Sequence, residues 1–127
     1  TLLRGLQRDM GLTLVFITHD LGVASYLCEE IAIMYLGRIV ETGPTDAVLA
    51  APAHPYAAAL RAAAPRFFEP LPEPLPGEIP SPLDLPPGCR FSGRCPMVQP
   101  DCQTRDPQLG RHGEGRAVAC LHPLGAA

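Results

Sequence analysis

The sequence contains no lysine: all ten of its basic residues are arginines, against 13 acidic residues. The net charge of −3 at pH 7 argues against a general electrostatic role on nucleic acid. No apolar run reaches the roughly 18 residues that a helix needs to cross a bilayer, and the first residues do not read as a secretory leader. We therefore expect a soluble chain that has no membrane span of its own and no nucleic-acid partner.

Large apolar residues are scarce toward the end of the sequence. Residues 88–123 contain six of them: Phe91, Met97, Val98, Leu109, Val118 and Leu121. So small a set does not close a hydrophobic core, because segments of about 40 residues usually need a metal or disulfides to fold. The same segment holds four of the five cysteines in the chain.

Proline, by contrast, is abundant, with 16 residues. Nine of them lie at positions 65, 70, 72, 74, 76, 80, 82, 86 and 87. Because proline interrupts helices and central strands, this segment is predicted to be an extended connector. The expected organisation is an α/β part over residues 1–64, a proline-rich linker over 65–87 and a cysteine-rich extension over 88–127.

Residues 13–20, TLVFITHD, are the stretch around which the first part is organised. Their β-branched and aromatic side chains predict a strand over 12–17 that is buried on both faces. Ligands of open α/β sheets bind beyond the carboxyl ends of the strands, so His19 is a candidate site residue. The simpler alternative is that His19 only closes the strand and caps the next helix.

Helical spacing predicts four helices, over residues 2–10, 20–29, 46–51 and 56–64. Gly11 is expected to end the first helix, and Asp20 and Thr45 are expected to cap the second and third. Pro55 stands at the favoured first position of the fourth helix. Two apolar runs on either side of Gly37 predict a β-hairpin between the second and third helices, over residues 31–36 and 38–41.

The four cysteines of the last segment show the spacing Cys89-x5-Cys95-x6-Cys102-x17-Cys120. Cys28 falls in a helical pattern, where we expect a buried small apolar residue. Disulfides are one interpretation of the four, although no secretory leader precedes them. Structural zinc is a second, although the usual Cys-x2–4-Cys knuckle is absent. An iron–sulfur cluster is the third, since four thiolates also bind it and wider spacing is tolerated.

Basic residues near the cysteines bear on this choice. Five arginines are expected to surround the thiolates, offset their negative charge and lower their pKa values: Arg90, Arg94, Arg105, Arg111 and Arg116. His112 and His122 are spare candidate ligands, with solvated loop histidines as the simpler interpretation. We therefore expect a metal centre, with zinc and iron–sulfur both open.

Several of these segments together resemble a known family. Residues 16–21 (FITHDL) resemble the switch-histidine motif of ABC transporter ATPases, and residues 34–41 (MYLGRIVE) resemble the antiparallel strands that follow it. Three further segments resemble the C-terminal extension of the ATP-binding subunits of oligopeptide/dipeptide importers: HPY at 54–56, GCRFSGRCP at 88–96 and RAVAC at 116–120. The resemblance covers essentially the whole chain. It implies the C-terminal part of a P-loop ABC ATPase domain followed by a metal-binding extension.

The resemblance also implies roles for particular residues. His19 would contact the terminal phosphate of ATP, bound with Mg²⁺, and help hold the attacking water. A 4Fe-4S cluster would be bound by Cys89, Cys95, Cys102 and Cys120. The implied partners are a second ATPase subunit and transmembrane permease subunits, at the cytoplasmic face of the plasma membrane. The implied process is uptake of peptides, nickel or another small solute.

Three motifs of that family are absent from the sequence: the phosphate loop Gly-x4-Gly-Lys-Ser/Thr, the signature helix, and the strand that carries the catalytic glutamate. We expect these to lie upstream of Thr1, so that the chain alone neither binds nor hydrolyses ATP appreciably. The alternative is a free-standing iron–sulfur or zinc regulatory module without ATPase activity. A nucleic-acid-binding zinc domain is a third hypothesis, which the acidic balance disfavours.

Overall fold

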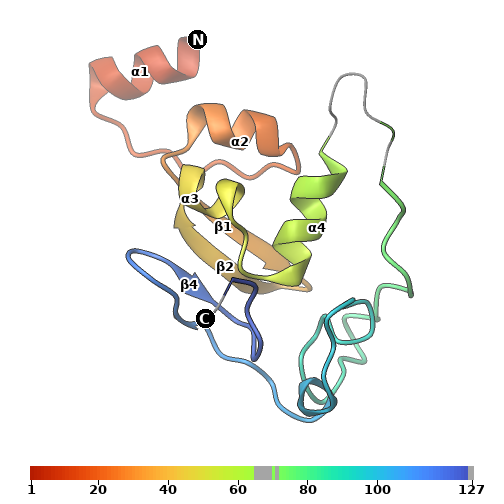
Figure 1. Cartoon of the computed structure of the whole chain (residues 1–127). Helices are drawn as coiled ribbons and strands as arrows, with labels where there is room; N and C mark the ends of the chain where they lie inside the picture. Colours follow the sequence, from red (N-terminus) through yellow and green to blue (C-terminus); the bar gives the residue numbers. More distant parts are fainter. Residues whose placement is uncertain (65–69, 71, 126–127) are drawn as a thin grey trace.

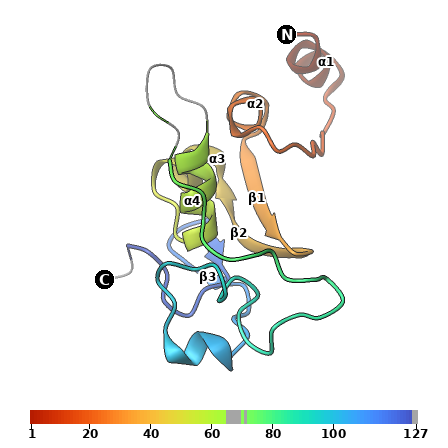
Figure 2. The ribbon, with the colours of Figure 1, turned by 90° about the vertical axis from the view of Figure 1, so that its right-hand side faces the viewer.

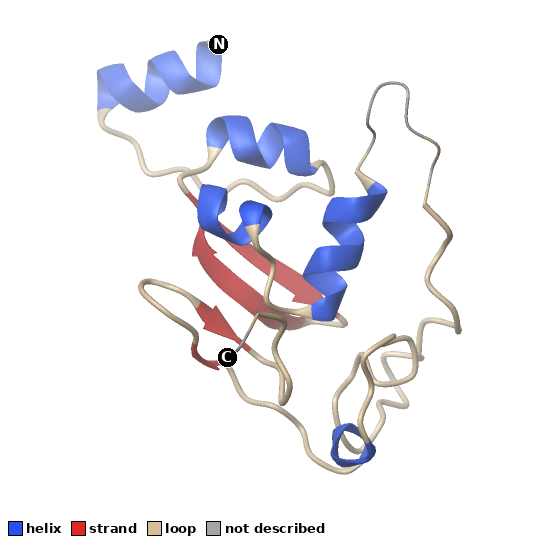
Figure 3. Cartoon of the chain, viewed as in Figure 1, coloured by secondary structure: helices blue, strands red, loops and turns tan. Residues whose placement is uncertain are grey.

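The computed structural model describes residues 1–64, 70 and 72–125 of the chain. These residues form a small α/β fold around a four-stranded antiparallel sheet in the order β1-β2-β4-β3 (Figures 1 and 3). The strands are β1 (Glu30–Tyr35), β2 (Arg38–Pro44), β3 (Gly110–Arg111) and β4 (Ala117–Val118). The helices are α1 (Leu2–Met10), α2 (Leu21–Leu27), α3 (Thr45–Ala50), α4 (Pro55–Ala63) and the short 3₁₀ helix η1 (Pro100–Gln103). The predicted α/β class is confirmed.

The predicted strand over residues 12–17 is wrong: this stretch is an irregular, exposed segment between α1 and α2. Val15 and Ile17 are 91% and 94% exposed. A strand needs neighbours for its backbone hydrogen bonds, and the described sheet pairs only β1 to β4 with one another. Helix α1 forms as predicted and ends at Gly11 with φ 64°, yet none of its residues is buried.

Of the two predicted N-caps one is confirmed and one is wrong, and the predicted position of Pro55 at the start of α4 is confirmed. The Asp20 carboxylate accepts a hydrogen bond from the Val23 N–H at 3.1 Å, and Pro55 occupies the first turn of α4. Thr45, however, is the first residue of α3 and makes no side-chain cap hydrogen bond. Its backbone N–H donates instead to the Glu29 carbonyl at 2.9 Å, which ties the start of α3 to the start of β1.

Helix α2 is shorter than predicted, since it ends at Leu27 and not at residue 29. Cys28 follows it as the C-cap residue in extended conformation, and its side chain is half-buried. The expectation of a buried Cys28 within a helix was therefore wrong, because the chain leaves the helix one residue before Cys28 to enter β1.

The hairpin of β1 and β2 is confirmed, with Tyr35 opposite Arg38 and Gly37 in the turn at φ 76°. An irregularity after Ile33 places Ile33 opposite Glu41 and Met34 opposite Ile39. Helices α3 and α4 pack on one face of this hairpin (Figure 2). The buried core beneath them consists of Ile33, Tyr35, Val40, Val48, Ala57 and Phe91.

The cysteine-rich segment contributes to this same core. Phe91 is 1% exposed, and its ring lies 5.2 Å from that of Tyr35 and 5.4 Å from that of Tyr56. Strand β4 pairs with β2, through Glu41 opposite Val118. Residues 88–125 therefore pack on the first part of the chain, which supplies the other residues of the core that buries Phe91.

The predicted proline-rich connector falls partly outside the described residues, which omit 65–69 and 71. Residues 70 and 72–87 contain neither helix nor strand. The domain boundaries at 64/65 and 87/88 stay a prediction. None of the helices in the described part of the chain is both long and apolar enough to span a membrane.

Candidate functional site

The four cysteines predicted as metal ligands line one small cavity. Cys89 and Cys95 lie in the turns that follow the proline-rich segment, Cys102 lies on η1, and Cys120 follows β4. His54 and Phe91 line the same cavity. All four thiols are free, so the disulfide interpretation has no support in the structure.

A close backbone approach holds two of these cysteines together. The Cys89 N–H donates to the Cys102 carbonyl at 2.8 Å. A side chain at the preceding Gly88 would place its Cβ 2.3 Å from that carbonyl oxygen, so only glycine fits at this position. The glycine before Cys89 therefore allows η1 to come close to the first cysteine.

Burial has the largest effect on the ionisation of Cys89, Cys95 and Cys120. Burial raises the pKa values of Cys89 and Cys95, and it raises the pKa of Cys120 to about 11. The expectation that arginines lower these pKa values was wrong, because several arginines are engaged elsewhere. Arg90 donates to the Leu36 carbonyl, and Arg116 pairs with Glu41.

One group of potential metal ligands lies close together at the edge of the cavity. Among the described residues, Asp101, Cys102 and His122 form the only group of three or more potential ligands whose donor atoms all lie within 4.8 Å of one another. The four free thiols are the donor set of a thiolate centre, and zinc and an iron–sulfur cluster both use such a set.

A buried carboxylate connects the cavity to the rest of the fold. The Glu41 carboxylate on β2 is fully buried and accepts hydrogen bonds from the backbone N–H groups of Ala53, at 3.0 Å, and His54, at 2.8 Å. Arg116 completes this set with an ion pair at 2.7 Å and also donates to the Ala51 carbonyl at 2.7 Å. Glu41 thereby fixes the turn before α4 and the strand β4 to the sheet.

His54 lies where this network meets the cavity. Its Nδ1 accepts a hydrogen bond from the Tyr56 N–H at 3.0 Å, which caps α4 and assigns the proton to Nε2 in the neutral ring. The side chain is 1% exposed, and its ring lies 5.7 Å from that of Phe91. Burial lowers the pKa of His54 to about 4, although the nearby Glu41 carboxylate acts in the opposite direction.

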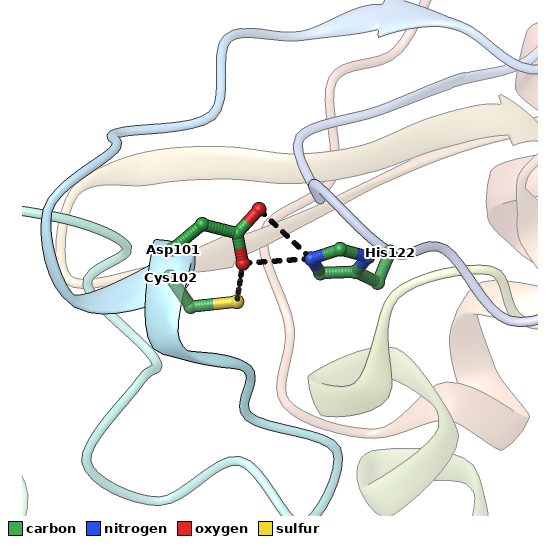
Figure 4. Close-up of side chains that lie close together, drawn as sticks. All are labelled: Asp101, Cys102 and His122. Atoms are coloured by element: carbon green, nitrogen blue, oxygen red, sulfur yellow. Dashed lines mark hydrogen bonds and ion pairs between the residues drawn. The ribbon is translucent and has the colours of Figure 1, made fainter.

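His122, one of the two spare histidines, is paired rather than free. Its Nε2 lies 2.8 Å from Oδ1 and 3.0 Å from Oδ2 of Asp101, and the neighbouring Cys102 sulfur lies 3.8 Å from Oδ1 (Figure 4). This hydrogen bond, together with Arg105, lowers the pKa of Asp101. His112 lies elsewhere, beside the β3–β4 turn, where its backbone N–H donates to the Arg116 carbonyl at 2.9 Å.

His19 is not brought to the cysteine cavity, whose lining comes from residues 54–122. It lies in the exposed segment between α1 and α2, one residue before the N-cap Asp20. No hydrogen bond or ion pair connects its ring to another described residue. The described chain therefore contains two separate candidate sites: the exposed His19 and the buried cysteine cavity.

Sequence reasoning missed Glu41, His54 and Asp101 as site residues. His54 was noted in the HPY segment without a role. Asp101 stands directly before Cys102, and His122 stands two residues after Cys120, so adjacency to predicted ligands was an available signal. For Glu41 the sequence offered no signal, because its partner Arg116 lies 75 residues further along the chain.

Comparison with known proteins shows which family the chain resembles. Residues 40–102 match the family described as oligopeptide/dipeptide transporter, C-terminal region. The chain is 49% identical over 123 residues to a probable peptide ABC transporter ATP-binding protein, y4tS, of Sinorhizobium fredii. It is 41% and 44% identical to the dipeptide transport ATP-binding proteins DppF of Haemophilus influenzae and Escherichia coli.

These three alignments cover 94%, 95% and 94% of this chain but only 35%, 38% and 36% of the relatives. The chain thus spans little more than a third of the length of the curated relatives it matches. The family match includes Glu41, His54 and three of the cavity cysteines. It begins after His19 and ends before Cys120.

Proposed function

Because the chain belongs to the family of ATP-binding proteins of oligopeptide/dipeptide ABC transporters, we propose that it is the C-terminal part of such a subunit. The complete subunit would hydrolyse ATP with Mg²⁺ to drive uptake of peptides or another small solute. It would act at the cytoplasmic face of the membrane with a second ATPase subunit and permease subunits. The observation that carries this proposal is the alignment of 94–95% of the chain with peptide-transporter ATP-binding proteins.

The exposed apolar surface of the first 17 residues supports the same proposal. Met10, Val15 and Ile17 are 64%, 91% and 94% exposed. Exposed apolar side chains in such a row are typical of a surface that another part of a protein covers. In the complete subunit, further strands would pair with residues 12–17 and bury them. The phosphate loop and the catalytic glutamate would belong to that preceding part.

The alternative of a free-standing iron–sulfur or zinc module is not supported, since the relatives aligned with the chain are ATP-binding proteins.

The role that we propose for His19 is to donate a hydrogen bond to the γ-phosphate and to help hold the attacking water. A donor aimed at the charge that develops on a transferring phosphoryl group stabilises the transition state more than the ground state.

Replacing His19 by alanine in the complete subunit should lower the rate of ATP hydrolysis by about 100-fold or more, because one transition-state donor is lost. Nucleotide binding should change little, since most binding contacts would come from the preceding part. Steady-state phosphate release and binding of a fluorescent nucleotide measure the two effects separately. His112→Ala is the matched control, and an unchanged hydrolysis rate in His19→Ala would refute the role.

For the cavity, we propose that a 4Fe-4S cluster is held by Cys89, Cys95, Cys102 and Cys120. Four free thiols that line one cavity support this ligand set. When bound, the cluster supplies four iron–thiolate bonds that connect η1 to the flanking loops, and a one-electron couple. Gly88 and Phe91 contribute by bringing η1 close to Cys89 and by excluding water from one side.

Replacing Cys95 by serine should reduce the iron and acid-labile sulfide bound per chain at least several-fold after anaerobic purification, together with the visible absorbance. The control is Cys28→Ser, since Cys28 lies outside the cavity and is also half-buried. Full iron content in Cys95→Ser, or equal losses in both variants, would contradict the ligand assignment. Zinc bound by all four thiolates in the wild-type chain would contradict the cluster type.

A further inference from the structure

Asp101, Cys102 and His122 bring three different donor atoms to one point at the edge of the cysteine cavity (Figure 4). Asp101 and Cys102 are consecutive residues of η1, and His122 comes from the segment that follows β4. The Nε2–Oδ1 distance is 2.8 Å and the Sγ–Oδ1 distance is 3.8 Å. The structure therefore assembles a nitrogen, an oxygen and a sulfur donor without any of the other three cavity cysteines.

These separations are close to those of a single tetrahedral ion. Bonds of ~2.0 Å to nitrogen and oxygen and ~2.3 Å to sulfur place the donors of one zinc ion about 3.3–3.6 Å apart. The Sγ–Oδ1 separation of 3.8 Å is slightly above this range and the Nε2–Oδ1 separation of 2.8 Å is below it, so small movements of the side chains would bring both into it. A mixed nitrogen, oxygen and sulfur set suits a borderline ion such as Zn²⁺ and does not suit Mg²⁺ or Ca²⁺.

Oδ1 is the carboxylate oxygen close to both other donors. Nε2 of His122 lies 2.8 Å from Oδ1 and 3.0 Å from Oδ2, and Sγ of Cys102 lies 3.8 Å from Oδ1. Nη1 of Arg105 forms an ion pair with Oδ2 at 3.6 Å. Its positive charge opposes a cation, and the ionised Asp101 and a Cys102 thiolate offset that charge.

Exposure differs across the three side chains in the way a metal site requires. Cys102 is buried, whereas Asp101 is half-buried and His122 is exposed. An ion can therefore enter from solvent past His122 and reach the sulfur at the inner end. Water would supply the fourth ligand, as in open zinc sites.

We propose that Asp101, Cys102 and His122 form a single-ion site for Zn²⁺ or a similar divalent cation. This site is distinct from the four-thiolate centre, shares only Cys102 with it, and is independent of the proposed ATPase function. Because one sulfur cannot serve both centres as a terminal ligand, the two metals compete for the chain. A chain that lacks iron would then carry one zinc ion at η1.

The test is a titration of the metal-free chain with Zn²⁺ alone, under anaerobic conditions, against a chromophoric chelator. We expect one ion per chain and an affinity that falls about tenfold or more in both His122→Ala and Asp101→Asn. The control His112→Ala should keep the wild-type affinity. Cys95→Ser separates this site from a four-thiolate zinc site: an affinity within about twofold of wild type supports the proposal, and a tenfold loss overturns it.

Substitution with Co²⁺ provides a readout that does not depend on how well a variant folds. In the wild-type chain the sulfur-to-cobalt charge-transfer band should have the intensity of one thiolate, and that of four thiolates would overturn the proposal. Wild-type zinc affinity in His122→Ala would overturn it as well. Neither failure touches the iron content of the anaerobically purified chain or the hydrolysis rate of the complete subunit, so the proposals fail separately.

Discussion

Replacing Glu41 by alanine is expected to lower the free energy of unfolding of the chain by about 3–5 kcal/mol, which is the cost typical of removing one partner from a buried ion pair. The Glu41 carboxylate is fully buried and accepts from Ala53, His54 and Arg116. Alanine leaves two buried backbone N–H groups without acceptors and leaves the charge of Arg116, whose side chain is 14% exposed, without a partner.

Urea unfolding of the chain, followed by circular dichroism, measures this loss. The matched control is Glu30→Ala, an exposed glutamate on the neighbouring strand β1, for which we expect a change within about 0.5 kcal/mol. Adding Arg116→Leu to Glu41→Ala should recover part of the stability, because it removes the unpaired charge. A loss below 1 kcal/mol in Glu41→Ala, or no recovery in the double variant, would show that the network is not a stabilising unit.

Acidification is expected to destabilise the chain through His54. Burial lowers the pKa of His54 from 6.5 to about 4 in the folded chain. Between these values the unfolded chain binds a proton that the folded chain does not, so unfolding is favoured as the pH falls. The contribution of neutral His54 to the free energy of unfolding is therefore fully present above pH 6.5, and it is lost progressively as the pH falls to 4. A difference of this size is worth about 3 kcal/mol.

The measurement is the unfolding free energy of the metal-free chain, in chelator, between pH 7 and pH 4. His54→Asn is the matched variant, because asparagine can still accept from the Tyr56 N–H at the start of α4 and does not titrate. We expect the free energy of unfolding of His54→Asn to fall by about 3 kcal/mol less than that of the wild-type chain between pH 7 and pH 4. Equal pH dependence in the two chains would exclude His54 as the acid-sensitive group.

Local patterns predicted the elements whose formation depends on nearby residues. Gly11 ends α1, Asp20 caps α2, Pro55 begins α4, and Gly37 turns the hairpin, all as expected. Each of these depends on backbone conformation or on a hydrogen bond within a few residues, which sequence spacing reports directly. The strand over 12–17 was wrong because strand formation depends on partners, and hydrophobic composition alone does not provide them.

The sequence predicted the residues of the candidate sites better than it predicted their contacts and ionisation. The four cysteines were predicted as one ligand set, and the structure brings them around one cavity. The shifts in the pKa values of Cys89, Cys95 and Cys120 were predicted in the wrong direction, since the number of nearby arginines in the sequence does not reveal that Arg116 pairs with Glu41 and that Arg90 donates to the Leu36 carbonyl. The pair of Asp101 and His122 joins residues 21 positions apart, which no local pattern indicates.

The amino-acid sequence by itself determined the residue types that this chain offers for chemistry, the turns and caps of its short elements, and, through its motifs, its transporter family. Only the tertiary structure decided that Phe91 joins the core of the hairpin, that Glu41 holds Arg116 and the turn before α4, and that His122 meets Asp101 beside Cys102. The physical reason is range: caps and turns depend on neighbours along the chain, whereas burial, ion pairing and thiol ionisation depend on which distant segments pack together.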